Sequence, residues 1–243
     1  MINIVIPMAG LGSRFSNEGY LKPKPFIDVN GLPMISRVLD NLNYPNANYI
    51  LIAQKSHLER EKDLVNLIEE KYNATFIPIE GLTEGTACTV LYARKLINNN
   101  QPLLIANSDQ IIDSDINSFI NNARDRNLDG SILCFEDSEM NPKWSFAKLD
   151  KNKLVIQVKE KKAISKFATV GIYFFAKGKN FVNAAIDMII ENDRVNNEFY
   201  SCPVYNYLIR DHKKIGIFLI KQNEMHGIGT PEDLKSYLKN IGC

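Results

Sequence analysis

Short apolar runs alternate with amphipathic segments along the first half of the chain, and this alternation limits the folds that the chain can adopt. The apolar runs have the length and β-branched content of buried strands, and they lie at 2–8, 49–54, 75–79 and 102–109. The segments between them carry apolar residues at the three- and four-residue spacing of helices, at 34–43, 58–72 and 86–98. The pattern predicts βαβ units around a mostly parallel sheet.

From about residue 130 the order of the expected elements changes. Further strands are predicted at 130–135, 169–175 and 215–220, with intervening antiparallel strands joined by a turn at 151–154, and one helix at 180–193. No internal repeat, low-complexity tract or linker interrupts the chain. We therefore expect a single α/β domain over 1–243, with one half over about 1–128 and the other over about 129–243.

Charge and cysteine content exclude several kinds of partner. The chain has 29 Lys and Arg against 28 Asp and Glu, so no broad basic surface is available for nucleic acid or an anionic membrane. Cysteines occur at four scattered positions and form no CxxC pair, which argues against a zinc site: Cys88, Cys134, Cys202 and Cys243. With neither a signal-peptide pattern nor an apolar stretch of roughly 18 residues, we expect a soluble, cytoplasmic protein.

The segment after the first strand, "PMAGLGSRF" (7–15), has the composition of an anion-binding loop. Gly10 and Gly12 can take positive φ and let backbone N–H groups approach an anion. Arg14 can hold phosphate oxygens, and Lys24 stands between prolines that keep its segment extended. A dinucleotide motif lacks its third glycine here, and a P-loop lacks its lysine. Alone the loop is equally an ordinary turn, whereas together with Lys24 it favours a polyphosphate.

Carboxylates follow the predicted strand at 102–109. Asp109 stands at its end, where ligands bind in open α/β sheets, and a lone carboxylate there either holds Mg²⁺ with substrate phosphates or caps the next turn. Asp113 and Asp115 form a DxD triplet that is a second candidate metal site. We favour helix capping for both, because the helical pattern "INSFINNARD" follows them.

Small residues at 85–87 open the helical pattern at 86–98. They would let a flat ring lie against the backbone, although a plain helix start with Thr86 as N-cap explains them equally well. In the second half, Glu160 and Glu198 suit hydroxyl recognition and Lys161 suits a phosphate oxyanion. Instead of binding a ligand, the charged residues at 159–162 could equally form the solvent-exposed end of a strand.

Taken together, "PMAGLGSRF…PKP", "EGTA", "NSD", "EKK", "TVGIYFF", "NEF" and "GIGTPEDL" resemble the sugar-phosphate nucleotidyltransferase family, also called nucleoside-diphosphate-sugar pyrophosphorylases. The motifs run in the family's order from residue 2 to about residue 238, and some similar members serve capsule assembly. The resemblance implies a Rossmann-like α/β fold with a mixed, mostly parallel sheet flanked by helices. It also implies the reaction of an NTP with a sugar 1-phosphate to give an NDP-sugar and pyrophosphate, with Mg²⁺.

The resemblance further implies roles for single residues. Catalysis would rest on Arg14 and Lys24 at the phosphates and on Asp109 at the metal ion. The nucleotide would also contact a set in the first half, in which Gln54 and Gly85 read the base: Met8, Ala9, Gly10, Leu11, Gly12, Ser13, Gln54, Gly85 and Thr86. The acceptor would contact a set in the second half: Glu160, Lys161, Gly171 and Glu198.

Two positions depart from the family's pattern. Gly227 stands where the family usually has an aspartate as second metal ligand. Either Asp109 then holds the ion mostly with phosphates and water, or a neighbour such as His226 or Glu224 compensates. Ala9 stands where guanylyl members tend to carry a glycine, which favours a pyrimidine nucleotide, CTP or UTP/dTTP.

We therefore expect a nucleotidyltransferase that joins an NTP to a sugar 1-phosphate or similar small phosphorylated acceptor, for cell-surface polysaccharide or capsule precursors. Phosphocholine, glycerol phosphate and capsule amidophosphates are alternative acceptors. A glycosyltransferase of the related fold, using Asp113 and Asp115, and a non-catalytic nucleotide sensor are alternative functions. No nucleic-acid or membrane partner is expected, and a homo-oligomer is compatible with the sequence.

Overall fold

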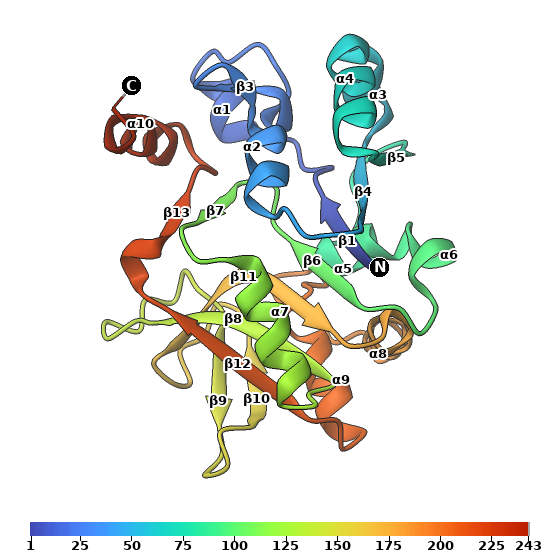
Figure 1. Cartoon of the computed structure of the whole chain (residues 1–243), viewed down its shortest axis with the longest axis vertical. Helices are drawn as coiled ribbons and strands as arrows, with labels where there is room; N and C mark the ends of the chain where they lie inside the picture. The colour runs from blue at the N-terminus through green and yellow to red at the C-terminus, as the bar shows by residue number, and fades with distance from the viewer. Residues whose placement is uncertain (243) are drawn as a thin grey trace.

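A nine-stranded mixed sheet forms the centre of the computed structural model, which describes residues 1–242; Cys243 lies outside the described residues. The strand order along the main path is β10-β9-β11-β6-β1-β4-β5, and β8 pairs with both β11 and β12 (Figure 1). The parallel part comprises β1 (Ile2–Pro7), β4 (Ala47–Gln54), β5 (Thr75–Ile79) and β6 (Leu103–Ala106). The remaining strands are β8 (Gly130–Glu136), β9 (Phe146–Leu149), β10 (Val155–Lys159), β11 (Phe167–Phe175) and β12 (Ile215–Ile220).

Each apolar run that the sequence marked as a strand is a strand of this sheet. The change after residue 130 is also confirmed, because β11 runs antiparallel to β6 and β8, and β9 antiparallel to β10. Both predicted halves of the chain therefore contribute to one sheet. The predicted α/β fold class, with a mixed sheet flanked by helices, is confirmed.

Two of the predicted helices are interrupted. The segment 58–72 divides at Glu61 into α3 (Lys55–Arg60) and α4 (Lys62–Tyr72), because Glu61 has a non-helical backbone, with φ −110° and ψ 33°. The segment 86–98 divides into α5 (Thr86–Leu91) and α6 (Arg94–Ile97) at Ala93, whose ψ of 2° ends the α-helical geometry. Periodicity did not reveal these breaks, since the apolar spacing continues across them.

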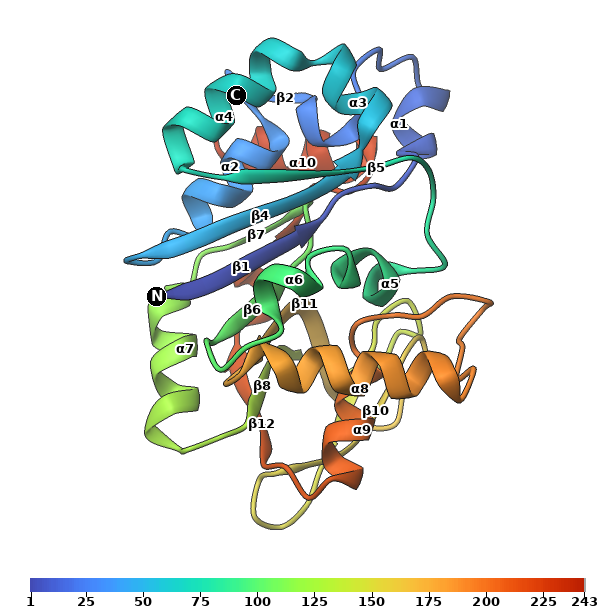
Figure 2. The ribbon, with the colours of Figure 1, turned by 90° about the vertical axis from the view of Figure 1, so that its right-hand side faces the viewer.

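Helices cover both faces of the sheet (Figures 1 and 2). On one face lie α1 (Ser13–Asn17), α2 (Met34–Asn41), α4, α7 (Ile116–Asp125) and α10 (Pro231–Asn240), whose buried apolar residues belong to the same core as Ile2, Ile4 and Ile6 of β1. On the other lie α5, α6, α8 (Gly178–Ile190) and α9 (Val204–Arg210), in the core that contains Val5 of β1. The alternation along β1 thus divides the apolar side chains between two cores.

Two small antiparallel sheets lie outside the main one. The pair β2 (Asp28–Val29) and β3 (Leu32–Pro33) follows the short 3₁₀ helix η1 (Lys24–Phe26). The pair β7 (Gln110–Ile112) and β13 (Met225–Gly227), the latter preceded by η2 (Gln222–Glu224), brings Gly227 opposite Gln110. This second pair carries residues from near the end of the chain to the carboxyl end of β6.

Two further observations concern the apolar character of the helices and the state of the cysteine side chains. Among residues 1–242, no helix has the length and apolar character that crossing a bilayer requires. Cys88, Cys134 and Cys202 are free thiols, and Cys134 and Cys202 are buried.

Candidate active site

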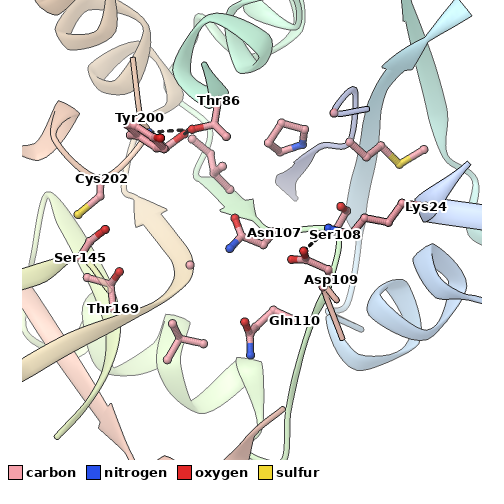
Figure 3. Close-up of a pocket in the computed structure, with 18 of the residues that line it drawn as sticks. Lys24, Thr86, Asn107, Ser108, Asp109, Gln110, Ser145, Thr169, Tyr200 and Cys202 are labelled. Atoms are coloured by element: carbon pink, nitrogen blue, oxygen red, sulfur yellow. Dashed lines mark hydrogen bonds and ion pairs between the residues drawn. The ribbon is translucent and has the colours of Figure 1, made fainter. Parts of the chain in front are cut away.

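A cavity of about 530 Å³ opens where β1 and β6 end. Its first wall is formed by the loop after β1 and by Lys24, and its second wall by strands β9 and β11 and the segment around Tyr200. Figure 3 shows Lys24 on one side of this space and Ser145, Thr169 and Cys202 on the other. Residues from both halves of the chain therefore meet across one cavity.

Gly12 sets the shape of the first wall. It adopts the left-handed conformation, with φ 64°, and caps the N-terminus of α1. Phe15 in α1 is buried, which holds the loop on the core. A Cβ at Gly12 would lie 2.9 Å from the Lys24 Cβ, so a side chain there would push the loop away from Lys24. Gly10, for which we also expected positive φ, does not adopt it.

Lys24 and Asp109 form an ion pair on the first wall of the cavity (Figure 3). Their side chains are 19% and 24% exposed, so the pair is partly shielded from water. Asp109 follows β6 and is fixed from the C-terminal side, because its carbonyl accepts a hydrogen bond from Ile228 N at 2.9 Å. A Cβ at Gly229 would lie 2.5 Å from Asp109 Oδ2, which shows how closely this turn packs on the carboxylate.

The residues around Asp109 decide whether a divalent cation fits. No cluster of three or more His, Cys, Asp or Glu side chains occurs among residues 1–242. His226 Nε2 lies 2.9 Å from Asp113 Oδ2, and Glu224 accepts a hydrogen bond from Lys221 N at 2.7 Å, so both are engaged away from Asp109. Mg²⁺ is commonly held by one or two carboxylates plus substrate phosphates. The site therefore fits a magnesium ion that Asp109 shares with nucleotide oxygens.

The DxD triplet lies outside the cavity. Asp115 caps α7, and its carboxylate accepts a hydrogen bond from Asn117 N at 3.0 Å; this bond and one from the Asn117 side chain lower its pKa. The capping prediction is therefore confirmed for Asp115. For Asp113 it is wrong, because this carboxylate contacts His226 instead of a helix terminus.

The "EGTA" turn packs tightly against the segment after α8. Gly85, not Thr86, is the N-cap of α5, so the alternative with Thr86 as cap was wrong by one residue. A Cβ at Gly85 would lie 2.6 Å from Phe199 N, and Phe199 N donates a 2.7 Å hydrogen bond to the Glu84 carbonyl. Thr86 Oγ1 accepts a 3.0 Å hydrogen bond from Ser201 N. This packing brings Tyr200 and Ser201 to the cavity wall.

The second wall is rich in buried hydroxyl groups. Ser145 donates a hydrogen bond to the Glu160 carboxylate, and burial raises the pKa of Glu160 in spite of that bond. Thr169 Oγ1 and the Tyr173 hydroxyl lie 3.4 Å apart, and both residues are buried. We call the group formed by Ser145, Glu160, Thr169, Tyr173 and Cys202 the hydroxyl recess. Its side chains can donate and accept hydrogen bonds, and Glu160 is the one among them that can carry a charge at neutral pH.

A backbone irregularity in β11 shapes the floor of the cavity. The register of β11 against β8 shifts between Thr169 and Tyr173, and Gly171 within the shift has φ 92°. A Cβ at Gly171 would collide with the Asn107 side chain, because it would lie 2.8 Å from the amide carbon of Asn107. Glycine therefore lets the Asn107 side chain lie against the floor.

The structure brings most of the predicted site residues together. Those that line the cavity are Met8, Gly10, Gly12, Ser13, Arg14, Lys24, Thr86, Asp109, Glu160 and Gly171. Outside the lining lie Ala9, Leu11, Gln54, Gly85, Lys161 and Glu198. Gln54 Nε2 donates a 2.8 Å hydrogen bond to the Ala9 carbonyl, and the Lys161 ammonium donates one of 2.8 Å to the Tyr200 hydroxyl. The roles assigned to all these residues stay predictions.

Sequence reasoning missed several lining residues, among them Asn107, Ser108, Gln110, Ser145, Thr169, Tyr173, Tyr200, Ser201 and Cys202. Ser108 and Gln110 flank Asp109, so their place at a strand end was a usable signal. Ser145 and Thr169 stand alone within apolar strand patterns and gave no signal of their own. Only the pairing of β9 with β11 brings them together.

Comparisons with known proteins show what the chain is similar to. The model of the nucleotidyl transferase family matches residues 4–241. The bifunctional protein GlmU of Methanococcus vannielii is 28% identical over 253 residues, covering 99% of this chain and 56% of that protein. A choline-phosphate cytidylyltransferase of Haemophilus influenzae is 32% identical over 77 residues, covering 29% of this chain and 33% of that protein. The chain thus spans about half the length of the GlmU relatives.

A solved structure shares the fold. The nucleoside-diphosphate-sugar pyrophosphorylase of Vibrio cholerae superposes with a TM-score of 0.78 at 24% identity, covering 97% of this chain and 99% of that one.

Gly227 leaves room for a second carboxylate, which gives a first prediction. A Cβ there would meet nothing within 4 Å, and the residue does not have positive φ. Because β13 pairs Gly227 with Gln110, the residue directly after Asp109, a side chain at position 227 would stand near the start of β7. Gly227→Asp should strengthen Mn²⁺ binding without nucleotide by about tenfold, the scale on which one added group changes a metal site. Isothermal titration measures it, with Gly227→Asn as the uncharged control; equal affinities of the two variants would refute the assignment.

Proposed function

Because the chain belongs to the nucleotidyl transferase family, we propose that it joins a nucleoside triphosphate to a sugar 1-phosphate, or to a similar small phosphorylated acceptor, and releases pyrophosphate. The proposal is carried by one observation, which is that two walls face each other across the same cavity. One wall holds the Gly12 loop and the Lys24–Asp109 pair, and the other holds the hydroxyl recess. The product would serve as a precursor of cell-surface polysaccharide or capsule.

The proposed reaction needs no nucleophile from the protein. An oxygen of the acceptor phosphate attacks the α-phosphorus, the bond from that phosphorus to the bridging oxygen breaks, and pyrophosphate leaves with the electron pair. Positioning and electrostatic stabilisation carry such a step. Arg14 and Lys24 line the wall on which the triphosphate would lie, and their fixed positive charges would oppose the charge that builds up on the leaving group.

Asp109 would hold Mg²⁺ together with the nucleotide phosphates, and the bound ion would neutralise part of their negative charge. The Lys24 ammonium is paired with this carboxylate in the structure. Nucleotide binding would offer Lys24 phosphate oxygens in exchange for Asp109. The ion pair thus keeps both side chains at the place where the triphosphate would enter.

The hydroxyl recess supports a polyhydroxylated acceptor. Hydroxyl groups of Ser145, Thr169 and Tyr173 both donate and accept hydrogen bonds, as the hydroxyls of a sugar do. The Glu160 carboxylate accepts from donors and is largely buried. Lys161, paired with Tyr200 at the rim, would turn from the phenol to the acceptor phosphate.

We also propose a pyrimidine nucleotide, CTP or UTP/dTTP, on the basis of Ala9. Its side chain is buried, and its carbonyl holds Gln54. Guanylyl members of the family tend to carry a glycine at this position, and although Ala9 lies outside the cavity lining, its methyl group would fill space that such a glycine leaves open.

A cytidylyltransferase acting on phosphocholine is the second candidate, because the Haemophilus influenzae choline-phosphate cytidylyltransferase matches part of the chain. A quaternary ammonium is recognised by aromatic ring faces. Here the Lys143 ammonium already lies 4.6 Å from the centre of the Trp144 ring. The occupied Trp144 face favours the sugar phosphate over phosphocholine.

Two other functions have less support. A glycosyltransferase would need Asp113 and Asp115 at its metal ion, but these residues contact His226 and cap α7. A non-catalytic sensor would not need the hydroxyl recess that faces the triphosphate wall.

A pyrophosphate-release screen tests the function. The purified protein with Mg²⁺ is offered CTP, UTP, dTTP, ATP and GTP, each with glucose 1-phosphate, phosphocholine or glycerol 3-phosphate. We expect turnover with a pyrimidine nucleotide and the sugar phosphate. Release of NDP from a nucleotide sugar in place of pyrophosphate, or tight nucleotide binding without turnover, would contradict the proposal.

The role of Lys24 is tested by two lysine variants two positions apart. Lys24→Ala should lower kcat by roughly 10²–10³, the scale for losing one preorganised electrostatic contact. Lys22→Ala removes an exposed lysine outside the cavity lining and should change kcat little. Similar kcat values for the two variants would show that Lys24 does not act on the triphosphate.

A further inference from the structure

Gln110 is a buried residue whose side chain the structure leaves unpaired. It lines the cavity directly after Asp109, and only 7% of its surface is exposed. Among residues 1–242, its Nε2 atom has no hydrogen-bond partner, although the atom is shielded by the protein. Leaving a buried donor unsatisfied destabilises the folded protein. Most buried polar groups are paired, so this one needs an explanation.

The neighbouring backbone explains why no protein group satisfies the amide. Gln110 opens β7 and pairs with Gly227 of β13 in antiparallel register. Residues directly opposite each other in such a pair face the same side, so a side chain at position 227 would stand next to the Gln110 amide. A Cβ at Gly227 would meet nothing within 4 Å. The cross-strand neighbour that would normally pack on Gln110 is therefore missing.

The other end of β7 is held by a structural amide from helix α2. Asn41 donates a 2.7 Å hydrogen bond from Nδ2 to the Ile112 carbonyl and accepts one of 2.9 Å from Ile112 N through Oδ1. Asn41 thus uses both ends of its amide to hold the strand. Gln110, two residues before Ile112, holds no strand in this way, and its side chain lines the cavity instead.

We infer that Gln110 is a specificity residue that binds an oxygen of the phosphorylated acceptor. It follows Asp109 in the chain and lines the same cavity as the hydroxyl recess. An amide donor without a protein partner matches an oxygen of a sugar hydroxyl or a phosphate, and binding there removes the cost of the unsatisfied group. The inference rests on the proposed function for the identity of the acceptor, and it adds a binding residue that no sequence motif marked.

The test uses Gln110→Met, which keeps the length of the side chain and removes both polar atoms. The KM for glucose 1-phosphate should rise about tenfold, on the scale of one hydrogen bond in a buried site, while the KM for the nucleotide changes much less. The Tm should stay equal or rise, because the variant removes a donor that was unsatisfied in the free protein.

Asn41→Leu, a change in α2 that removes the amide bonded to the other end of β7, is the matched control. It breaks two hydrogen bonds that the structure contains, so it should lower the Tm and leave the acceptor KM close to that of the wild type. A wild-type acceptor KM in Gln110→Met would overturn the inference. So would a Tm loss in Gln110→Met as large as that in Asn41→Leu, since the amide would then be a structural group.

A wild-type protein that releases no pyrophosphate would contradict the proposed function and not this inference. The inference is then decided by the rise in Tm that saturating glucose 1-phosphate produces, since a ligand that binds the folded state stabilises it. We expect a rise in the wild type and a smaller one in Gln110→Met. No rise in the wild type, or equal rises in both, would overturn it.

Discussion

The ion pair between Lys24 and Asp109 joins the two parts of the chain on which the proposed chemistry depends. Lys24 belongs to the segment that follows the glycine loop, and Asp109 stands beyond the end of β6. Neither side chain is deeply buried, so the pair contributes modestly to stability. Its importance is positional, because it holds a cation and a carboxylate together at the place where a triphosphate with a metal ion would need both.

The sheet explains how such a pair faces an acceptor site. β6 lies between β1, which delivers the glycine loop, and β11, which runs in the opposite direction and carries the hydroxyl recess. The antiparallel partner therefore brings residues of the second half of the chain to the edge where the parallel strands end. The register shift in β11 at Gly171 shapes one wall, and the close contact of Gly12 with Lys24 shapes the other. Together they let the two walls enclose one cavity.

Much of this arrangement could be predicted from the sequence, for physical reasons. Strands buried on both faces read as continuous apolar runs, so the strands of the main sheet that carry such runs were recognisable. Asp109 could be found because a carboxylate stands at the end of an apolar segment without an apolar reason to be there, and Lys24 because the prolines on both sides keep its segment extended. The resemblance to nucleotidyltransferases followed from the order of the motifs, and the family match over residues 4–241 confirms it.

The remaining features depend on contacts between distant segments. The pairing of β13 with β7 joins residues more than 100 positions apart, and it alone explains why Gln110 has an open neighbour and why His226 meets Asp113. Ser145 and Thr169 become a recess only through strand pairing. The breaks at Glu61 and Ala93 are backbone events within continuous apolar spacing. Local patterns carry none of this information.

A double-mutant cycle on Lys24 and Asp109 tests the central claim that the two side chains act as one unit on the triphosphate. The kcat/KM for pyrophosphate release is measured for the wild type, Lys24→Ala, Asp109→Asn and the double variant. Residues that act as a unit show strongly non-additive losses, so the double variant should be about as impaired as the worse single variant. Losses that multiply across the two single variants would contradict the account.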